Sequence, residues 1–248
     1  MSSSRNKAPT HLKIAYIGGG SRGWVHILMN DLALCADLSG EILLYDIDLE
    51  AARLNEKLGN WLQTQPGVLS FWKYRAVETL PEALKGADFA FISIQPGSLE
   101  MMAHEIAVAE KYGLFFPVGD TTGAPGLMRG LRSAIIFEGF AHASAEHCPD
   151  AWVINYTNPM TICTRTLTKV EPELKVFGCC HEVFGTQRLL GELAQEALEL
   201  PDAPRRDDIR VNVLGINHFT WIDQADFQGH DLLAIARQHI EKPGVRRP

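Results

Sequence analysis

The residues with the clearest chemical potential begin with a glycine loop. Gly18, Gly20 and Gly23 form a Gly-x-Gly-x-x-Gly pattern, and Asp46 follows its last glycine by 23 positions. Such glycines let backbone N–H groups approach a diphosphate at a helix N-terminus, while an acid on the second strand binds ribose hydroxyls. The spacing predicts a dinucleotide site that prefers NAD to NADP, because a carboxylate repels a 2′-phosphate. The alternative is a tight turn without a ligand.

A thiol and an imidazole form the second candidate site. Cys180 and His218 are 38 positions apart, and both side-chain types bind divalent metals. Two ligands do not complete a structural zinc site, but they suit a metal whose remaining positions are filled by substrate and water. A buried thiol and a hydrogen-bonded core histidine explain the same residues without a metal.

These motifs must be positioned by an alternation of apolar strands and amphipathic helices. The pattern predicts strands over 12–17, 41–46, 89–94, 152–155 and 175–178, with helices over 24–38 and 48–63. Uniformly apolar strands are typical of a parallel sheet covered on both faces, so we expect an α/β, Rossmann-like doubly wound fold. Polar residues that follow the strands then meet at the carboxyl edge of the sheet.

The domain organisation changes near a polar, proline-containing segment at 201–208. We expect a loose tail over 1–10, an NAD-binding domain over 11–200 and the incomplete beginning of an α+β substrate domain over 201–248. So short a segment is too small for a core of its own. We therefore expect self-association through its uncovered apolar side chains, or disorder over 242–248. These side chains are Val211, Leu214, Phe219, Trp221, Phe227, Leu232, Leu233 and Ile235.

Composition excludes several classes of protein. The 248 residues are 46% hydrophobic and carry a net charge of −7. This is typical of a globular protein and leaves no basic footprint for nucleic acid or for a membrane surface. No apolar run is long enough for a membrane span. The five cysteines have no disulfide-framework spacing, which indicates thiols in a reducing, cytoplasmic compartment.

Together the motifs resemble glycoside hydrolase family 4, whose members depend on NAD and a divalent metal. The resemblance covers essentially the whole chain, and the Cys-His-Glu-Val sequence at 180–183 is similar to the α-galacturonidase branch. Other branches are α-galactosidases, α-glucosidases and 6-phospho-glycosidases. The matching segments are Ile17–Gly23, Tyr45–Asp48, Val118–Gly123, Asn155–Pro159, Cys180–Glu182 and Gly215–Phe219.

The resemblance implies a set of binding residues. Cys180 and His218 would ligate Mn2+ or another divalent ion, with oxygens from the substrate completing its shell, and Asn158 would contact substrate or metal. Arg22 is a candidate for the substrate's anionic group, as are Arg129 and Arg132. The residues expected at NAD are Gly18, Gly19, Gly20, Ser21, Gly23, Asp46, Ser93 and Asn155. Cys179 is expected in the core, because neighbouring residues of a strand point to opposite faces.

The implied reaction is hydrolysis of α-galacturonides, or related α-glycosides, by oxidation and elimination. NAD accepts hydride from C3, the C2 proton and the C1 leaving group depart, water adds and the hydride returns. Asp120 and His181 are the catalytic candidates, Glu182 is an alternative acid for the leaving group, and the C2 base is expected beyond residue 248. We also expect a homo-oligomer.

Two other functions fit parts of the sequence. One is an NAD-dependent sugar or hydroxyacid dehydrogenase without a metal, which would release NADH. The other is an inactive NAD-binding fragment of a family 4 hydrolase, which metal-dependent hydrolysis of an aryl glycoside would exclude.

Overall fold

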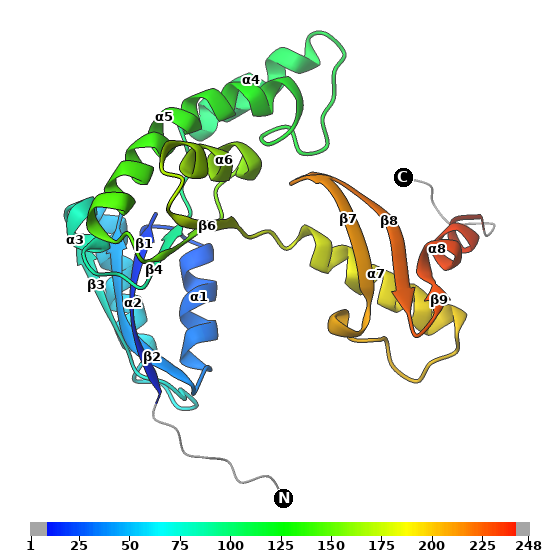
Figure 1. Cartoon of the computed structure of the whole chain (residues 1–248), viewed down its shortest axis with the longest axis horizontal. Helices are drawn as coiled ribbons and strands as arrows, with labels where there is room; N and C mark the ends of the chain where they lie inside the picture. The colour runs from blue at the N-terminus through cyan, green and yellow to red at the C-terminus, as the bar shows by residue number, and fades with distance from the viewer. Residues whose placement is uncertain (1–8, 242–248) are drawn as a thin grey trace, which may run out of the picture. The chain divides into compact units, whose positions relative to one another are not determined.

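Six parallel strands form one sheet in the computed structural model, which describes residues 9–241. Their order is β3-β2-β1-β4-β5-β6, so the direction of winding reverses between β1 and β4 (Figure 1). This order confirms the predicted Rossmann-like fold, in which ligands bind at the carboxyl ends of the strands beside the reversal. The strands are β1 (Thr10–Ile17), β2 (Leu38–Tyr45), β3 (Trp72–Val77), β4 (Phe89–Ile92), β5 (Trp152–Asn155) and β6 (Lys175–Gly178).

Alternate side chains of β1 enter two different cores. Ala15 and Ile17 pack with residues of α3, α5 and α6, whereas Ile14 and Tyr16 pack with residues of α1 and α2. Both faces of the sheet are therefore buried, which explains why its central strands are apolar throughout. The helices of this unit are α1 (Trp24–Ala33), α2 (Leu49–Leu62), α3 (Leu80–Leu84), α4 (Leu99–Glu110), α5 (Gly123–His147) and α6 (Met160–Val170).

Several elements differ from the sequence-based expectation, β3 and α1 among them. The edge strand β3 was not predicted, because Lys73 and Arg75 alternate with its buried aromatic residues Trp72 and Tyr74 and interrupt the apolar pattern. Helix α1 ends at Ala33 and not at residue 38, since Leu38 already pairs with Thr10 in the sheet. The expected loose tail over 1–10 is also too long by its last residue, because Thr10 begins β1. Residues 1–8 lie outside the described part of the chain.

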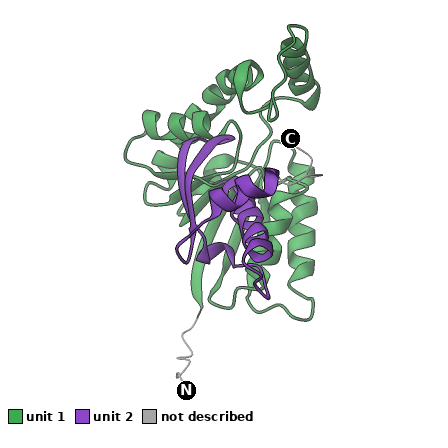
Figure 2. Cartoon of the chain, turned by 90° about the vertical axis from the view of Figure 1, so that its right-hand side faces the viewer, with its two compact units in different colours: residues 1–179 green, residues 180–248 purple. Residues whose placement is uncertain are grey.

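The chain divides into two compact units, residues 1–179 and 180–248 (Figure 2). The division falls after Cys179 and not after residue 200 as expected, because Leu190 and Ala194 of α7 belong to the core of the second unit. Up to residue 241, this unit combines antiparallel strands with two α-helices. Its elements are α7 (Glu182–Ala197), the 3-10 helix η1 (Arg206–Asp208), β7 (Arg210–Ile216), β8 (Phe219–Phe227), β9 (His230–Asp231) and α8 (Leu232–Glu241).

The apolar side chains of the second unit are covered more fully than the sequence predicted. Phe227 and Leu232 are buried, and Val211, Leu233 and Ile235 are partly buried against the same core. The expectation that all of them stay uncovered is wrong, because α7 supplies the missing partners.

Four residues nevertheless form an exposed apolar face on the β7–β8 hairpin. The cross-strand pairs Leu214–Trp221 and Ile216–Phe219 lie on one side of the hairpin, with exposures from 48% to 64%. The expected disorder over 242–248 lies outside the described residues.

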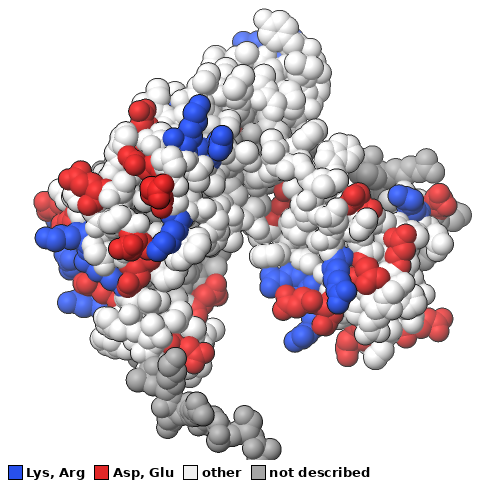
Figure 3. Space-filling view, viewed as in Figure 1, with Lys and Arg blue, Asp and Glu red and all other residues white. Residues whose placement is uncertain are grey.

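Charged residues of both signs are interspersed within each unit on the face that Figure 3 shows. Among the described residues, no helix is both long enough and apolar enough to span a membrane.

The contact between α2 and β3 predicts a stability effect. A Cβ added at Gly59 would lie 2.5 Å from the ring of buried Tyr74. We expect Gly59→Ala to lower the free energy of unfolding by about 1–3 kcal/mol, because the ring must shift. Exposed Gly139 in α5 is the matched control, since no atom lies within 4 Å of its added Cβ. Gly139→Ala should be neutral or stabilising by up to about 1 kcal/mol. Equal urea midpoints for the two variants would contradict the packing argument.

Candidate active site

The glycine loop is confined between the carboxyl ends of β1, β2 and β4. The amides of Gly18 and Gly19 both donate to the Tyr45 carbonyl at 2.9 Å. Gly18 has a φ of +97°, and a Cβ there would collide with the Ser93 carbonyl oxygen. Nothing lies within 4 Å of a Cβ added at Gly23, the N-cap of α1, whose N-terminus has no side-chain cap. The loop is therefore packed tightly against the sheet and open at the N-terminus of α1. Backbone amides at such an opening can bind a diphosphate.

Asp46 lies directly behind this loop. Its Oδ2 accepts the amide of Gly20 at 2.8 Å, and its Oδ1 accepts the amide of Asp48 at 3.0 Å. These bonds fix the carboxylate, and each oxygen keeps a lone pair for a further donor. The geometry suits the ribose-binding role that the sequence predicts.

A buried amide that the sequence analysis missed anchors the loop from α2. The Asn55 Nδ2 donates to the carbonyls of Gly19 and Ser21 at 2.7 and 2.9 Å, while its Oδ1 lies 2.8 Å from the His26 Nε2. Because the amide nitrogen serves two carbonyls, Oδ1 must accept the histidine proton. A signal was present, since Asn55 is a polar residue on the buried face of the helix beside Ala52 and Gly59.

A cavity of about 830 Å³ begins at the glycine loop and continues past β4. Ser93 and Asn158 line it together with Gly18, Gly20 and Asp46. The Oδ1 of Asn158 is buried and has no hydrogen-bond partner among the described residues. A buried acceptor beside a cavity is costly without a donor, so it marks a place where a ligand hydroxyl or amide would bind.

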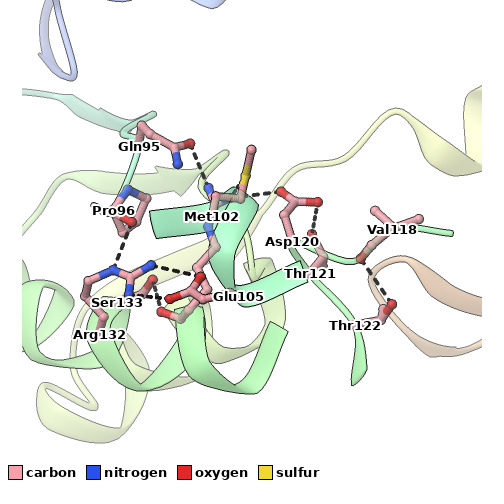
Figure 4. A network of polar contacts seen from close by, with 11 residues as sticks. Gln95, Pro96, Met102, Glu105, Val118, Asp120, Thr121, Thr122, Arg132 and Ser133 are labelled. Atoms are coloured by element: carbon pink, nitrogen blue, oxygen red, sulfur yellow. Dashed lines mark hydrogen bonds and ion pairs between the residues drawn. The ribbon is translucent and has the colours of Figure 1, made fainter. Parts of the chain in front are cut away.

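The three candidate arginines have different environments. Arg129, with a 5% exposed side chain, pairs with Asp120 at 3.0 Å and donates to the Gln95 Oε1 at 3.0 Å. Burial lowers the pKa of Arg129, although Asp120 acts in the opposite direction. Arg132 binds both oxygens of Glu105 and the Pro96 carbonyl (Figure 4). Arg22 is exposed and lines the cavity within the glycine loop.

Asp120 and Asn155 both have interaction partners within the protein. Asp120 lines the cavity as the partner of Arg129, so its charge is neutralised there. Asn155 is fully buried and is not among the described residues that line the cavity. Its side chain holds Thr157, accepting that residue's amide at 2.8 Å. Any effect of Asn155 on a cofactor therefore passes through the turn that carries Asn158.

The second unit brings Cys180 and His218 together. The Cys180 Sγ lies 3.7 Å from the His218 Nε2, although the two residues are far apart in sequence. Bond lengths to zinc of about 2.3 Å for sulfur and about 2.0 Å for nitrogen would separate two tetrahedral ligands by about 3.5 Å. The pair therefore fits a divalent ion. Within residues 9–241, no group of three His, Cys, Asp or Glu side chains could hold a metal, so the described residues offer this pair alone.

The other cysteines are less suited to metal binding. Burial raises the pKa of Cys148 to about 11 and that of Cys163 to about 12, so both stay protonated near neutral pH. Cys179 is half-buried and not in the core as expected, and it contacts Tyr156 in the first unit. Cys180 is half-buried and precedes α7, where the Glu182 amide donates to its Sγ at 3.4 Å. His181 is the N-cap residue of that helix.

Residues 13–196 match the family described as Family 4 glycosyl hydrolase. The chain is 53% identical to an α-galacturonidase of Thermoanaerobacterium saccharolyticum over 231 residues, covering 93% of this chain and 50% of that protein. An α-galactosidase of Bacillus subtilis is 31% identical, with 93% and 51% covered. The chain thus spans about half the length of these curated relatives.

Solved structures give the same picture. The Bacillus subtilis protein lplD, described as a glucosidase, matches with a TM-score of 0.86 and 50% identity, covering 95% of this chain and 55% of that one. A 6-phospho-β-glucosidase of Thermotoga maritima, solved with manganese, NAD+ and glucose-6-phosphate, has a TM-score of 0.75 at 23% identity. The match covers 93% of this chain and 53% of that one and shows a similarity of fold alone.

The role of Asn55 as an anchor predicts a selective loss. Asn55→Ala should weaken dinucleotide binding about tenfold, because the glycine loop loses two hydrogen bonds and becomes mobile. Asn60→Ala is the matched control on the same helix. Its side chain also makes two bonds, but to the backbone of Tyr74 and away from the loop. Calorimetric titration should show unchanged binding in the control. Equal weakening in both variants would indicate a general loss of stability instead.

Proposed function

The chain belongs to the family 4 glycosyl hydrolases, and we propose that it carries the NAD- and metal-binding parts of an α-galacturonidase. The observation that carries this proposal is the distance of 3.7 Å between Cys180 and His218. A dehydrogenase that uses only a nicotinamide cofactor has no need for a thiol and an imidazole at this distance. The pair therefore favours a metal-assisted reaction over the plain dehydrogenase.

The first unit supports NAD as the cofactor. Its glycine loop would hold the diphosphate, and Asp46 would accept the ribose hydroxyls. Bound NAD would supply a reversible hydride acceptor, and a divalent ion on Cys180 and His218 would supply a Lewis acid. Solved relatives with NAD and Mn2+ have the same fold, which is consistent with this assignment.

The remaining polar residues of the first unit have proposed roles of their own. Asn158 would orient a substrate hydroxyl with its unpartnered Oδ1. Asp120 would line the site as a neutralised partner of Arg129, which makes it a positioning group more than a proton carrier. Arg22 would bind an anionic group near the glycine loop, either the substrate carboxylate or a cofactor phosphate.

The second unit supplies the proposed proton donor. His181, the N-cap residue of α7 and the neighbour of the proposed metal ligand Cys180, would protonate the leaving group.

The proposed substrate is an α-galacturonide, and the proposed location is the cytoplasm. Relatives above half identity are α-galacturonidases, whereas the α-galactosidase and α-glucosidase relatives are near 31%. All five cysteines are free, as suits a reducing compartment. We further propose a homo-oligomer, supported by the exposed apolar hairpin face of Leu214, Ile216, Phe219 and Trp221.

Hydrolysis of p-nitrophenyl α-galacturonide tests the proposed function directly. We expect nitrophenol release only when NAD+, Mn2+ and a thiol reductant are all present, and less of it with the matching α-galactoside. Net accumulation of NADH on a free sugar would favour the dehydrogenase. Binding of NAD without hydrolysis under every condition would favour the inactive fragment.

The proposed metal centre predicts which thiol matters. Cys180→Ser and His218→Ala should abolish Mn2+ binding and Mn2+-dependent activity, because each removes one of the two protein ligands. NAD binding should remain, since the glycine loop lies in the other unit. Cys179→Ser is the matched control and should be mild. Metal affinity that survives both ligand substitutions would refute the assignment.

The position of Asp46 predicts the cofactor preference. The unsubstituted chain should bind NAD more tightly than NADP, because the carboxylate accepts ribose hydroxyls and repels a 2′-phosphate. Asp46→Asn should narrow this difference, as seen by fluorescence titration with both dinucleotides. Preferential binding of NADP by the unsubstituted chain would contradict the assignment.

A further inference from the structure

We infer that Glu182 is a positioning residue that sets the geometry of the Cys180–His218 pair. The inference deepens the proposed function and rests on it, because the pair is taken as the metal site. Glu182 begins α7, two positions after the cysteine, and its side chain reaches the β7–β8 hairpin that carries the histidine.

Glu182 contacts both halves of the pair. Its Oε2 accepts the backbone amide of His218 at 3.1 Å, and its Oε1 accepts the Thr220 hydroxyl at 2.9 Å. Its own backbone amide donates to the Cys180 Sγ at 3.4 Å. The bond to sulfur comes from the backbone, so a change of the side chain affects only the contacts to the hairpin.

The histidine requires such support because of its backbone conformation. Ile216 pairs with Phe219, so Asn217 and His218 form the two-residue loop of the hairpin. His218 has a φ of +59°, in the left-handed region that a residue with a Cβ seldom adopts. Such conformations persist where surrounding contacts impose them, and a carboxylate bound to the turn amide is a strong contact of this kind.

The second nitrogen of the His218 ring lacks the partner that usually orients a metal-binding imidazole. A metal-binding histidine usually donates its second ring nitrogen to a carboxylate or carbonyl, which fixes the ring. In the described residues, the Nδ1 of His218 is buried and has no hydrogen-bond partner. Apart from the contact of Nε2 with the Cys180 Sγ, the ring is therefore held through its backbone, and Glu182 binds the backbone amide of this residue.

These contacts also separate Glu182 from acid catalysis. Both oxygens of its side chain accept hydrogen bonds from the hairpin, one from the His218 amide and one from the Thr220 hydroxyl. The side chain thus serves the hairpin, and the proposed proton donor remains His181.

Titration of the full chain with Co2+ and with Mn2+ tests the inference, with the cobalt–thiolate absorption band as the spectroscopic signal. We expect Glu182→Ala to weaken the binding of both metals about 10- to 100-fold and to alter the absorption band. Losses of this size are typical when a residue that supports a metal ligand is removed. Glu182→Gln keeps one acceptor oxygen and should recover part of the affinity. Thr220→Val, which loses one bond, should have a smaller effect, and Thr220→Ser should match the unsubstituted chain.

NAD affinity and the thermal melting curve serve as controls for folding. If Glu182→Ala does not fold, the graded series of Glu182→Gln, Thr220→Val and Thr220→Ser still decides the question. Metal binding that is lost in Cys180→Ser but unchanged in the Glu182 and Thr220→Val variants would overturn this inference and leave the proposed metal centre standing. Failure of the unsubstituted chain to bind either metal would overturn the proposed metal centre and the inference with it.

Discussion

The close approach of three strand ends is the constraint on which the first unit depends. The glycine loop passes so near the Ser93 carbonyl and the backbone of β2 that Gly18 and Gly19 have no room for a Cβ. This crowding lies beside the point where the winding of the sheet reverses, between β1 and β4. The cavity stays open on the side of the loop that faces away from the sheet. The close packing of the strand ends therefore also shapes the cavity.

Polar side chains bind the loops at both candidate sites, and of these Asn55 and Asn155 are buried whereas Glu182 is half-buried. Asn55 binds the glycine loop with its amide, and Asn155 binds the turn before Asn158. Glu182 does the same for the hairpin of the second unit with its carboxylate. Loops carry few apolar contacts of their own, so hydrogen bonds to a buried partner are an effective way to fix them.

The three candidate arginines differ in whether an acidic side chain of the protein already balances their charge. Asp120 pairs with Arg129, and Glu105 pairs with Arg132, so two of the arginines that could bind an anion already have acidic partners. Arg22 in the glycine loop and the oxygens of Asp46 remain available to a ligand.

The sequence by itself predicted the Rossmann-like fold and the glycine loop with Asp46, and the family resemblance added Cys180 and His218 as candidate metal ligands. These features depend on local periodicity and on motifs whose residue types are fixed by chemistry. It missed β3, whose polar residues hide its edge position, and it placed the unit boundary too late, since the pattern of α7 does not reveal which core it joins. Only the tertiary structure brought the thiol within 3.7 Å of the imidazole and showed that Asn55 binds the glycine loop and Glu182 the β7–β8 hairpin. Such contacts join residues distant in the chain, and no local pattern encodes which distant partner a buried polar side chain will bind.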